Sequence, residues 1–316
     1  MTRALLIDTD PGIDDAVAIA LALASPEVDV IGISTVGGNS GLEATTRNAL
    51  RLLEFMGRTD IPVASGHDEP YARAKMETGY EPVHGHDGLA GVDLPEPTTK
   101  VVSTDAPAFL AEKIRNSPDP VTLIAIGPLT NIAHLVDRFP DVIPMIDRFV
   151  IMGGAARTGN VTPVAEFNIW HDPEAAKRVF ASGINTVMVG LDVTHSVKTY
   201  ETLWGWLKDG SKFGKVFDHI LTSYTNFYEI FYGERMTHQH DALAMAEAIW
   251  PNIMELEPAF IDVECQGELT LGMTVTDTRL RNGVEPNGYV AWSIDGDNFH
   301  QKLMSAFAKM SASVGN

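Results

Sequence analysis

The chain has 316 residues, of which 45% are apolar and 21% charged, a balance typical of folded enzymes rather than of disordered chains. Its 42 acidic and 23 basic side chains give a net charge of −19, so we expect no nucleic-acid or membrane partner; the charge favours cations and neutral small molecules. Cys265 is the single cysteine, which excludes a disulfide within the chain.

Short apolar runs alternate with helical stretches over the first two thirds of the chain. In chain order they are 4–7 (strand), 15–25 (helix), 28–36 (strand), 42–56 (helix), 61–64 (strand), 106–115 (helix), 121–126 (strand), 129–139 (helix), 149–152 (strand), 173–181 (helix) and 186–191 (strand). Strands buried on both faces are continuously apolar, and their alternation with helices indicates right-handed crossovers. The pattern therefore predicts an α/β fold with an open, mostly parallel sheet flanked by helices, similar to a Rossmann fold.

The last third of the chain has a different pattern. Residues 200–250 are helical and aromatic with no clear strand; strands return at 258–264 and 289–293, and a helix at 299–311 closes the chain. Cys265 is predicted to be a packed strand residue. The segment 67–100, rich in Gly, Pro and His, is predicted to be a long mobile loop. No repeat or linker composition divides the chain, so we expect one domain over 1–316.

Nothing in the sequence predicts export or membrane insertion. The N-terminal apolar run 4–7 is too short for a signal peptide, and no apolar run approaches the ~18 residues of a membrane span. We therefore expect a cytoplasmic protein.

The first predicted strand runs into a segment with four aspartates in eight positions, Asp8-Thr9-Asp10-Pro11-Gly12-Ile13-Asp14-Asp15. Asp8 and Asp10 should point to the same side of the strand end, and Asp14 and Asp15 open the next helix. This edge of an open α/β sheet is where ligands bind. Two carboxylates about 5 Å apart repel by roughly 3 kcal/mol at an effective dielectric of ~20, and a helix N-terminus offsets only ~1 kcal/mol.

A bound divalent cation would remove this repulsion, and oxygen ligands favour calcium or magnesium over zinc. The alternative is structural: Asp14 caps the helix, and the strand-end aspartates make turn hydrogen bonds.

The acidic segment is similar to the signature of the inosine–uridine preferring nucleoside hydrolases. Four further segments agree with that family, in the same order along the chain: Gly37-Gly38-Asn39; Gly127-Pro128-Leu129-Thr130-Asn131; Met152-Gly153-Gly154 with Asn160 and Glu166-Phe167-Asn168; and His240-Asp241-Ala242-Leu243-Ala244. The resemblance covers nearly the whole chain. It implies the nucleoside hydrolase fold, calcium-dependent cleavage of ribonucleosides into base and ribose, and a homodimer or homotetramer.

The resemblance also implies a role for individual residues. Calcium would be held by the carboxylates of Asp10, Asp15 and Asp241 and by the backbone carbonyl of Ile126, where the family usually has Thr. The residues implied in ribose binding are Asp14, Asn39, Asn160, Glu166 and Asn168, with Met152 packing nearby. His240 resembles the family's general acid, and His84 falls where the family has a histidine near the base, in a looser local match.

The expected chemistry gives each of these groups a task. Cleavage of a ribosyl C–N bond passes through an oxocarbenium-like transition state. Asp10 could take a proton from the attacking water, and His240 could protonate the leaving base, a contribution of roughly 10²–10⁴-fold. Glu166 and Asn168, two apart, would face the sugar together in an extended chain. Without the resemblance, a lone histidine or a polar loop pair would be assigned a structural role.

Two further observations have open interpretations. His195 follows another predicted strand and is assigned a structural role. The aromatic residues at 227, 228, 231 and 232 have helical spacing, which fits either core packing or a stacking wall for the nucleobase. Tyr228 or Tyr232 would then be the contact.

Two other functions compete with nucleoside hydrolysis. An Asp-x-Asp pair after a first strand also occurs in magnesium-dependent phosphatases of the haloacid-dehalogenase type, but these favour Gly-Thr where this chain has Pro11-Gly12. A non-catalytic, calcium-dependent ribose-binding protein would bind nucleoside without turnover. The preference for purine or pyrimidine nucleosides stays open.

Overall fold

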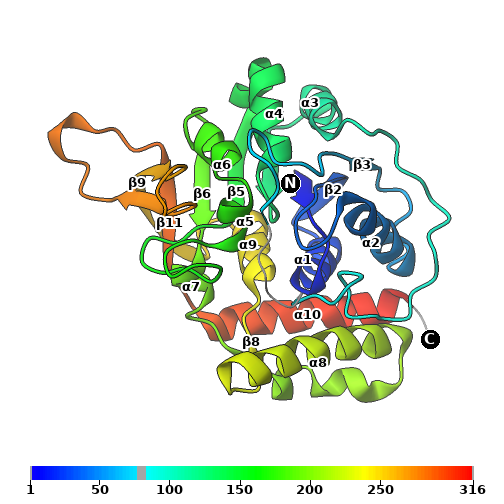
Figure 1. Ribbon diagram of the computed structural model, residues 1–316. Coiled ribbons are helices and arrows are strands. Elements are labelled where there is room, and N and C mark those ends of the chain that lie inside the picture. Colours follow the sequence, from blue (N-terminus) through cyan, green and yellow to red (C-terminus); the bar gives the residue numbers. More distant parts are fainter. Residues whose placement is uncertain (1, 77–82, 315–316) are drawn as a thin grey trace.

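The computed structural model describes residues 2–76 and 83–314, and its centre is a nine-stranded sheet. The strand order is β10-β9-β11-β6-β5-β4-β1-β2-β3 (Figure 1). Its strands are β1 Arg3–Thr9, β2 Val28–Thr35, β3 Val63–Ser65, β4 Val121–Ala125, β5 Ile146–Met152, β6 Thr186–Val189, β9 Met254–Val263, β10 Thr274–Asp277 and β11 Gly288–Ile294. Only the pairings of β9 with β10 and β11 are antiparallel, which confirms the predicted mostly parallel sheet.

Helices cover both faces of this sheet. The α-helices are α1 Ile13–Ala24, α2 Leu42–Phe55, α3 Ala106–Asn116, α4 Thr130–Arg138, α5 Phe167–His171, α6 Pro173–Phe180, α7 Leu191–Thr194, α8 Lys212–Tyr232, α9 His240–Ile249 and α10 Gly296–Val314. Short 3₁₀ helices are η1 Pro140–Met145, η2 Glu201–Leu203, η3 Gly205–Asp209 and η4 Arg281–Gly283.

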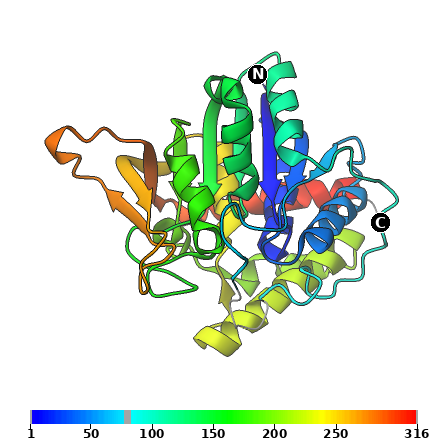
Figure 2. The same ribbon diagram turned by 45° about the horizontal axis from the view of Figure 1, so that its top comes forward.

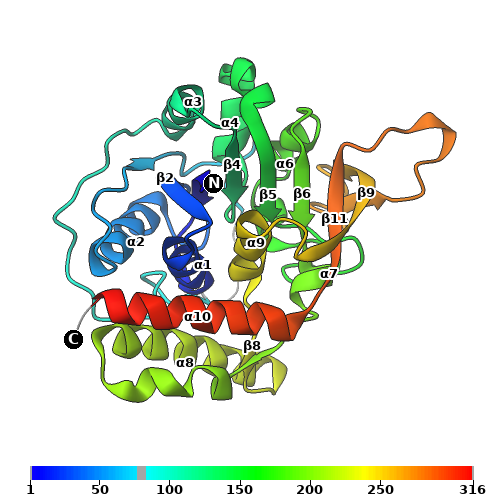
Figure 3. The same cartoon turned by 180° about the vertical axis from the view of Figure 1, so that it is seen from behind.

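The core is divided by the sheet into two apolar clusters. In β1, Leu5 and Ile7 pack in the cluster that includes α1, α2, α8, α9 and α10, whereas Leu6 packs in the cluster that includes α3, α4 and α6. Successive side chains of a strand point to opposite faces of the sheet, so one continuous apolar run contributes residues to both clusters. Seen from behind, α10 lies across α1, and α8 runs beside α10 (Figure 3). In the described part of the chain, no helix combines the length and apolar character that a membrane span needs.

The direction of the strand order reverses between β1 and β4. From β1 the chain adds β2 and β3 on one side, then returns to place β4, β5 and β6 on the other. In open α/β sheets, ligands bind outside the carboxyl ends of the strands at such a switch point. The acidic segment begins at the end of β1, and Ile126 follows β4, so both lie at this position.

The structure corrects several predicted elements. A separate two-stranded sheet, β7 Thr199–Tyr200 with β8 Met236–Thr237, lies largely within 200–250, where no strand was predicted. Strand β10, which was not predicted, forms one edge of the main sheet, and the connections around it project from the body of the molecule (Figure 2). Cys265 lies just beyond β9 rather than in a strand, with Sγ near two carbonyl oxygens. These short or edge strands carry too few alternating residues for a pattern to reveal them.

The predicted mobile loop is anchored over 83–91. Leu89 is fully buried, the side-chain amide of Asn48 donates to the Asp87 carbonyl at 2.7 Å, and the Ala90 N–H donates to the His84 carbonyl at 2.8 Å. The described residues of 67–100 form no helix or strand, as expected of a loop, and 83–91 pack against the rest of the molecule; residues 77–82 lie outside the described residues. The anchored turn holds His84 against the acidic segment.

Candidate active site

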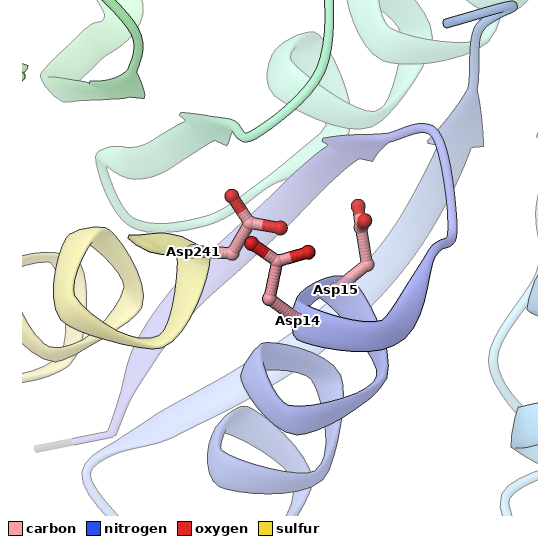
Figure 4. A group of neighbouring side chains, drawn as sticks. All are labelled: Asp14, Asp15 and Asp241. Carbon is pink, nitrogen blue, oxygen red and sulfur yellow. The ribbon is translucent and has the colours of Figure 1, made fainter. Parts of the chain in front are cut away.

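Three buried carboxylates meet at the switch point of the sheet. Asp14 and Asp15 lie in the first turn of α1, which Gly12 caps, and Asp241 lies in the first turn of α9. Because α1 and α9 pack against each other, ligand oxygens of the three aspartates all lie within 4.8 Å of one another. Figure 4 shows the three side chains gathered between the starts of the two helices.

Asp10 lies beside this cluster, directly after β1. Its Oδ2 accepts the Asn39 backbone N–H at 2.7 Å, whereas its Oδ1 is buried and has no hydrogen-bond partner among the described residues. A Cβ atom at Gly38 or Gly127 would collide with this carboxylate. The two glycines thus let the backbone close around Asp10.

Asp8 and Asp15 have different surroundings, although both belong to the acidic segment. Asp15 accepts hydrogen bonds from the Thr9 hydroxyl, from the Gly12 N–H at 2.8 Å and from the Asn39 amide at 3.1 Å. Asp8, inside β1, accepts from the hydroxyl of Ser34 and the amide of Asn131 instead. Asp8 therefore does not belong to the three-carboxylate cluster, which corrects the expectation that all four aspartates crowd one edge.

Burial dominates the electrostatics of these carboxylates. It raises the pKa of Asp14 to about 6, and burial together with the charge of Asp14 raises that of Asp15 to about 6. Burial and then the neighbouring aspartates raise the pKa of Asp10 and of Asp241 well above the ordinary range. Among the described residues, the basic group near these carboxylates is His84, and no lysine or arginine pairs with them, so their ionisation is unfavourable without a cation.

These residues fit a divalent cation. Carboxylate oxygens converge from two helices, Asp10 Oδ1 has no donor, and the cluster contains neither sulfur nor a histidine nitrogen. Such an all-oxygen set suits calcium or magnesium. The carbonyl of Ile126, at the end of β4, accepts the Asn168 side-chain amide at 3.1 Å.

The ribose-side candidates come from the loop that follows β5. Glu166 caps α5: its carboxylate accepts the Gly154 N–H at 2.8 Å and the Asn168 N–H at 3.0 Å. Burial raises the pKa of Glu166 to about 7 in spite of these bonds. The Asn168 amide also donates to the Met152 carbonyl at 3.0 Å and lies 3.6 Å from the Met152 sulfur. Asn160 is exposed, and its side chain accepts from the backbone N–H of the residue after Glu166.

Glu166 and Asn168 were expected to face the sugar together because they lie two apart in extended chain, and this reason is wrong. The two residues do not lie in extended chain; they occupy the cap and the first turn of α5. Glu166 is also buried rather than part of a solvated loop. A helix turn brings both side chains to the ends of β4 and β5, a placement that spacing by two did not predict.

His84 and a residue that the sequence reasoning missed, Tyr224, flank Asp14. His84 Nδ1 accepts the Ile13 backbone N–H at 3.0 Å and lies 3.9 Å from an Asp14 oxygen. Burial lowers the pKa of His84 to about 4. Tyr224 on α8 is buried with its ring centroid 6.2 Å from that of His84, and its hydroxyl hydrogen bonds to Asp14, which lowers the pKa of that carboxyl. Its spacing of four from Tyr228 could have indicated a shared helix face.

His240 begins α9, next to Asp241, and is held at both ring nitrogens. Its Nε2 lies 3.2 Å from the Tyr228 hydroxyl, and its Nδ1 lies 2.8 Å from the hydroxyl of Thr194. Burial lowers the pKa of His240 well below its usual value, and nearby histidines lower it further. Of the two candidate base contacts, Tyr228 is buried, whereas Tyr232 is 63% exposed and stacks on Tyr228.

His195 lies beside two other histidines. It is exposed, and its ring centroid lies 4.9 Å from that of His238 and 5.5 Å from that of His240. His238 is fixed by a hydrogen bond between Nδ1 and the Val197 carbonyl at 3.0 Å. The rings of His195, His238 and His240 therefore adjoin one another near the start of α9.

Comparison with known proteins identifies relatives of this arrangement. The family described as inosine-uridine preferring nucleoside hydrolase matches residues 5–301. The non-specific ribonucleoside hydrolase RihC of Escherichia fergusonii is 45% identical over 313 residues, which cover 98% of this chain and 100% of that protein.

Solved structures of nucleoside hydrolases also superimpose on this chain. The plant nucleoside hydrolase PpNRh1 superimposes with a TM-score of 0.91 at 35% identity, covering 97% of this chain and 99% of that one. The purine-preferring ribonucleoside hydrolase of Gardnerella vaginalis superimposes with a TM-score of 0.92 at 30% identity, covering 98% of this chain and 99% of that one.

Proposed function

Because the chain belongs to the inosine-uridine preferring nucleoside hydrolase family, we propose that it cleaves the N-glycosidic bond of ribonucleosides with water in a calcium-dependent reaction. The observation that carries this proposal is the buried cluster of Asp14, Asp15 and Asp241 at the switch point, beside an Asp10 oxygen that has no donor. In the part of the chain that the structure describes, no lysine or arginine pairs with these carboxylates, so the cluster suits a cation together with a neutral, hydroxyl-rich ligand.

Asp10, Asp15 and Asp241, with the Ile126 carbonyl, are the groups that we propose to hold the cation. When bound, a calcium ion would lower the pKa of a water molecule and anchor the ribose 2′- and 3′-hydroxyls. Asp10 Oδ1 is free to accept the proton of the attacking water, since Oδ2 is already occupied by the Asn39 N–H. Asp10 would thus act as both ligand and proton acceptor.

In the proposed site, the ribose is bound by polar side chains, several of which also hydrogen bond to the protein backbone. Asp14, Asn39, Asn160, Glu166 and Asn168 are the proposed contacts, with Met152 beneath them. Asn39 and Asn168 are held by several hydrogen bonds each, so their free donor and acceptor positions are preorganised. The buried negative groups Asp14 and Glu166 favour the positive charge that develops on the ribosyl ring.

The leaving base is protonated by His240, with Tyr228 and His84 at the base-binding side. The Tyr228 hydroxyl lies 3.2 Å from His240 Nε2, and this contact supports a short proton path from His240 to the base. His84 Nδ1 accepts the Ile13 N–H, so in the neutral ring the proton is on Nε2, which can donate toward the substrate.

One experiment tests the activity directly. Purified protein is incubated with inosine, adenosine, guanosine, uridine and cytidine, and free base and reducing sugar are measured. Equimolar release of both is the expected result, and the panel also ranks purine against pyrimidine substrates. Nucleoside binding without turnover would instead indicate a ribose-binding protein, and phosphate release from p-nitrophenyl phosphate with magnesium would indicate the phosphatase alternative.

A second experiment tests the metal. Activity should be lost in chelator and return with calcium, and calorimetry should show calcium binding that Asp10→Ala and Asp15→Ala abolish, since each leaves the ion without a charged ligand. Restoration by zinc but not by calcium, or wild-type calcium affinity in both variants, would contradict the proposed ligand set.

A further inference from the structure

Thr194 connects the end of the sheet to the proposed acid. It lies in α7, the helical turn that follows β6, and it is fully buried. Its hydroxyl oxygen is 2.8 Å from His240 Nδ1, while His240 Nε2 is 3.2 Å from the Tyr228 hydroxyl. The imidazole is therefore held between two hydroxyl groups that come from distant parts of the chain.

The Thr194 hydroxyl has no other hydrogen-bond partner in the part of the chain that the structure describes. A threonine in a helical turn often bonds back to the carbonyl four residues earlier. Here that carbonyl belongs to Gly190, which already accepts the N–H groups of Val193 and Thr194 at 3.2 and 3.1 Å. The hydroxyl is thus left to the imidazole, and removing either partner would leave a buried polar group unsatisfied.

A hydroxyl suits this position because it can either donate or accept. It accepts from Nδ1–H when the ring is an imidazolium and can rotate to donate when Nδ1 carries a lone pair. The hydroxyl can therefore hold the orientation of the ring through its hydrogen bond to Nδ1 whichever of the two groups is the donor.

Without Thr194, Tyr228 would be the single hydrogen-bond anchor of the His240 ring among the described residues. The neighbouring rings of His195 and His238, with centroids 5.5 and 5.8 Å away, make no hydrogen bond to it there. A ring anchored at one nitrogen can turn about its Cβ–Cγ bond and present the wrong atom to Tyr228.

We propose that Thr194 is a positioning residue for leaving-group protonation, because its hydroxyl holds His240 Nδ1 and leaves Nε2 facing Tyr228 and the base. This inference rests on the proposed function, in which His240 is the acid. In that step the C–N bond pair moves to the base, the Nε2–H bond breaks, and its proton goes to the base. The Nδ1–H bond remains, donated to Thr194.

The test compares two substitutions at this position. Thr194→Val keeps the branched shape and removes the hydroxyl, whereas Thr194→Ser keeps the hydroxyl. With uridine or inosine, the valine variant should lose about tenfold in kcat, the size of one lost hydrogen bond to a charged group, with KM changed less than about twofold. The serine variant should stay within about threefold of wild type. With p-nitrophenyl riboside, whose phenolate leaves without a proton, both should be close to wild type.

A matched control removes another buried hydroxyl. Thr225 on α8 donates to the Leu221 carbonyl at 2.9 Å and does not touch His240, so Thr225→Val should have wild-type kinetics. In a His240→Ala background, Thr194→Val should add no further loss, because Thr194 acts through His240. Ring-nitrogen chemical shifts of His240 in ¹⁵N-histidine-labelled protein, assigned with His240→Gln, should change in the valine variant. Should the valine variant fail to fold, Thr194→Ala, which also lacks the hydroxyl, replaces it.

The outcomes separate this inference from the proposed function. If His240→Ala loses activity selectively with natural nucleosides but Thr194→Val behaves as wild type, the inference is overturned and the acid role stands. Equal losses on both substrates, no rescue by serine, or additive losses in the double variant would assign Thr194 a general structural role and also overturn it. If His240→Ala loses activity equally with natural nucleosides and with p-nitrophenyl riboside, both the acid role of His240 and the inference about Thr194 are overturned.

Discussion

Asp241→Asn should make the metal-free protein more stable and the calcium-loaded protein less stable. Asp241 accepts no hydrogen bond from an N–H or hydroxyl group of the described residues, and its ligand oxygen lies within 4.8 Å of those of Asp14 and Asp15. At that distance a charged pair repels by about 3 kcal/mol at an effective dielectric of ~20. Loss of the favourable charge at the N-terminus of α9 costs up to ~1 kcal/mol. The net gain without metal is about 2 kcal/mol at a pH above the raised pKa of Asp241, where this carboxylate is charged, so unfolding is measured there.

Thermal unfolding in chelator and in calcium measures both effects. For a chain of this size, about 2 kcal/mol corresponds to a rise in Tm of roughly 4 °C in chelator. With calcium at ~100 times its Kd, the wild-type protein gains about 2.7 kcal/mol, whereas the variant, which lacks one ligand charge, should gain little. The order of the two proteins should therefore reverse on addition of calcium.

Asp172→Asn is the matched control for this reversal. Asp172 is also buried, but its carboxylate accepts from the Thr130 hydroxyl at 2.6 Å and from the Tyr71 and Ala175 N–H groups at 2.7 and 3.1 Å. Its substitution should lower Tm with and without calcium, since an amide nitrogen would face these donors. If Asp241→Asn also melts below wild type in chelator, the repulsion argument is wrong.

Three further predictions concern the substrate and the pH. His240→Ala should lose roughly 10²–10⁴-fold in kcat with inosine or uridine but much less with p-nitrophenyl riboside; equal losses on both would remove His240 as the acid. The kcat/KM for 2′-deoxyuridine should fall far below that for uridine, since buried polar groups would be left unpaired, and similar values would refute the proposed ribose contacts. Burial lowers the pKa of His171 to about 4. Because this value is below the unfolded one of ~6.5, the stability gained from the neutral ring is complete above that pH and is lost as the pH falls toward 4, by up to about 3 kcal/mol. His171→Gln should flatten this pH dependence in urea unfolding, and an unchanged slope would contradict it.

The sequence alone predicted most of the sheet and the position of the acidic segment. Continuous apolar runs marked the parallel strands because both of their faces are covered by helices, and this signal lies within each strand. The four aspartates between the end of β1 and the start of α1 pointed to a cation for a similarly local reason, since so many carboxylates in eight positions repel one another. Membership of the nucleoside hydrolase family could be inferred from five short segments that are spread along the chain.

The tertiary structure decided which of these groups meet. Asp8, which the sequence could not separate from Asp10, hydrogen bonds to Ser34 and Asn131 because β2 and α4 lie beside it. Residues far apart in the sequence form the rest of the site, as when α9 brings Asp241 to Asp14 and Asp15 of α1, and no local pattern records such contacts. Thr194 is ordinary in sequence, and its hydroxyl reaches His240 only because the end of β6 and the start of α9 converge. The periodicity of apolar residues reflects which face of a single helix or strand is buried, so it can be read from the sequence. A site depends on the distances between side chains of different elements, and these distances are set only when the whole chain has folded.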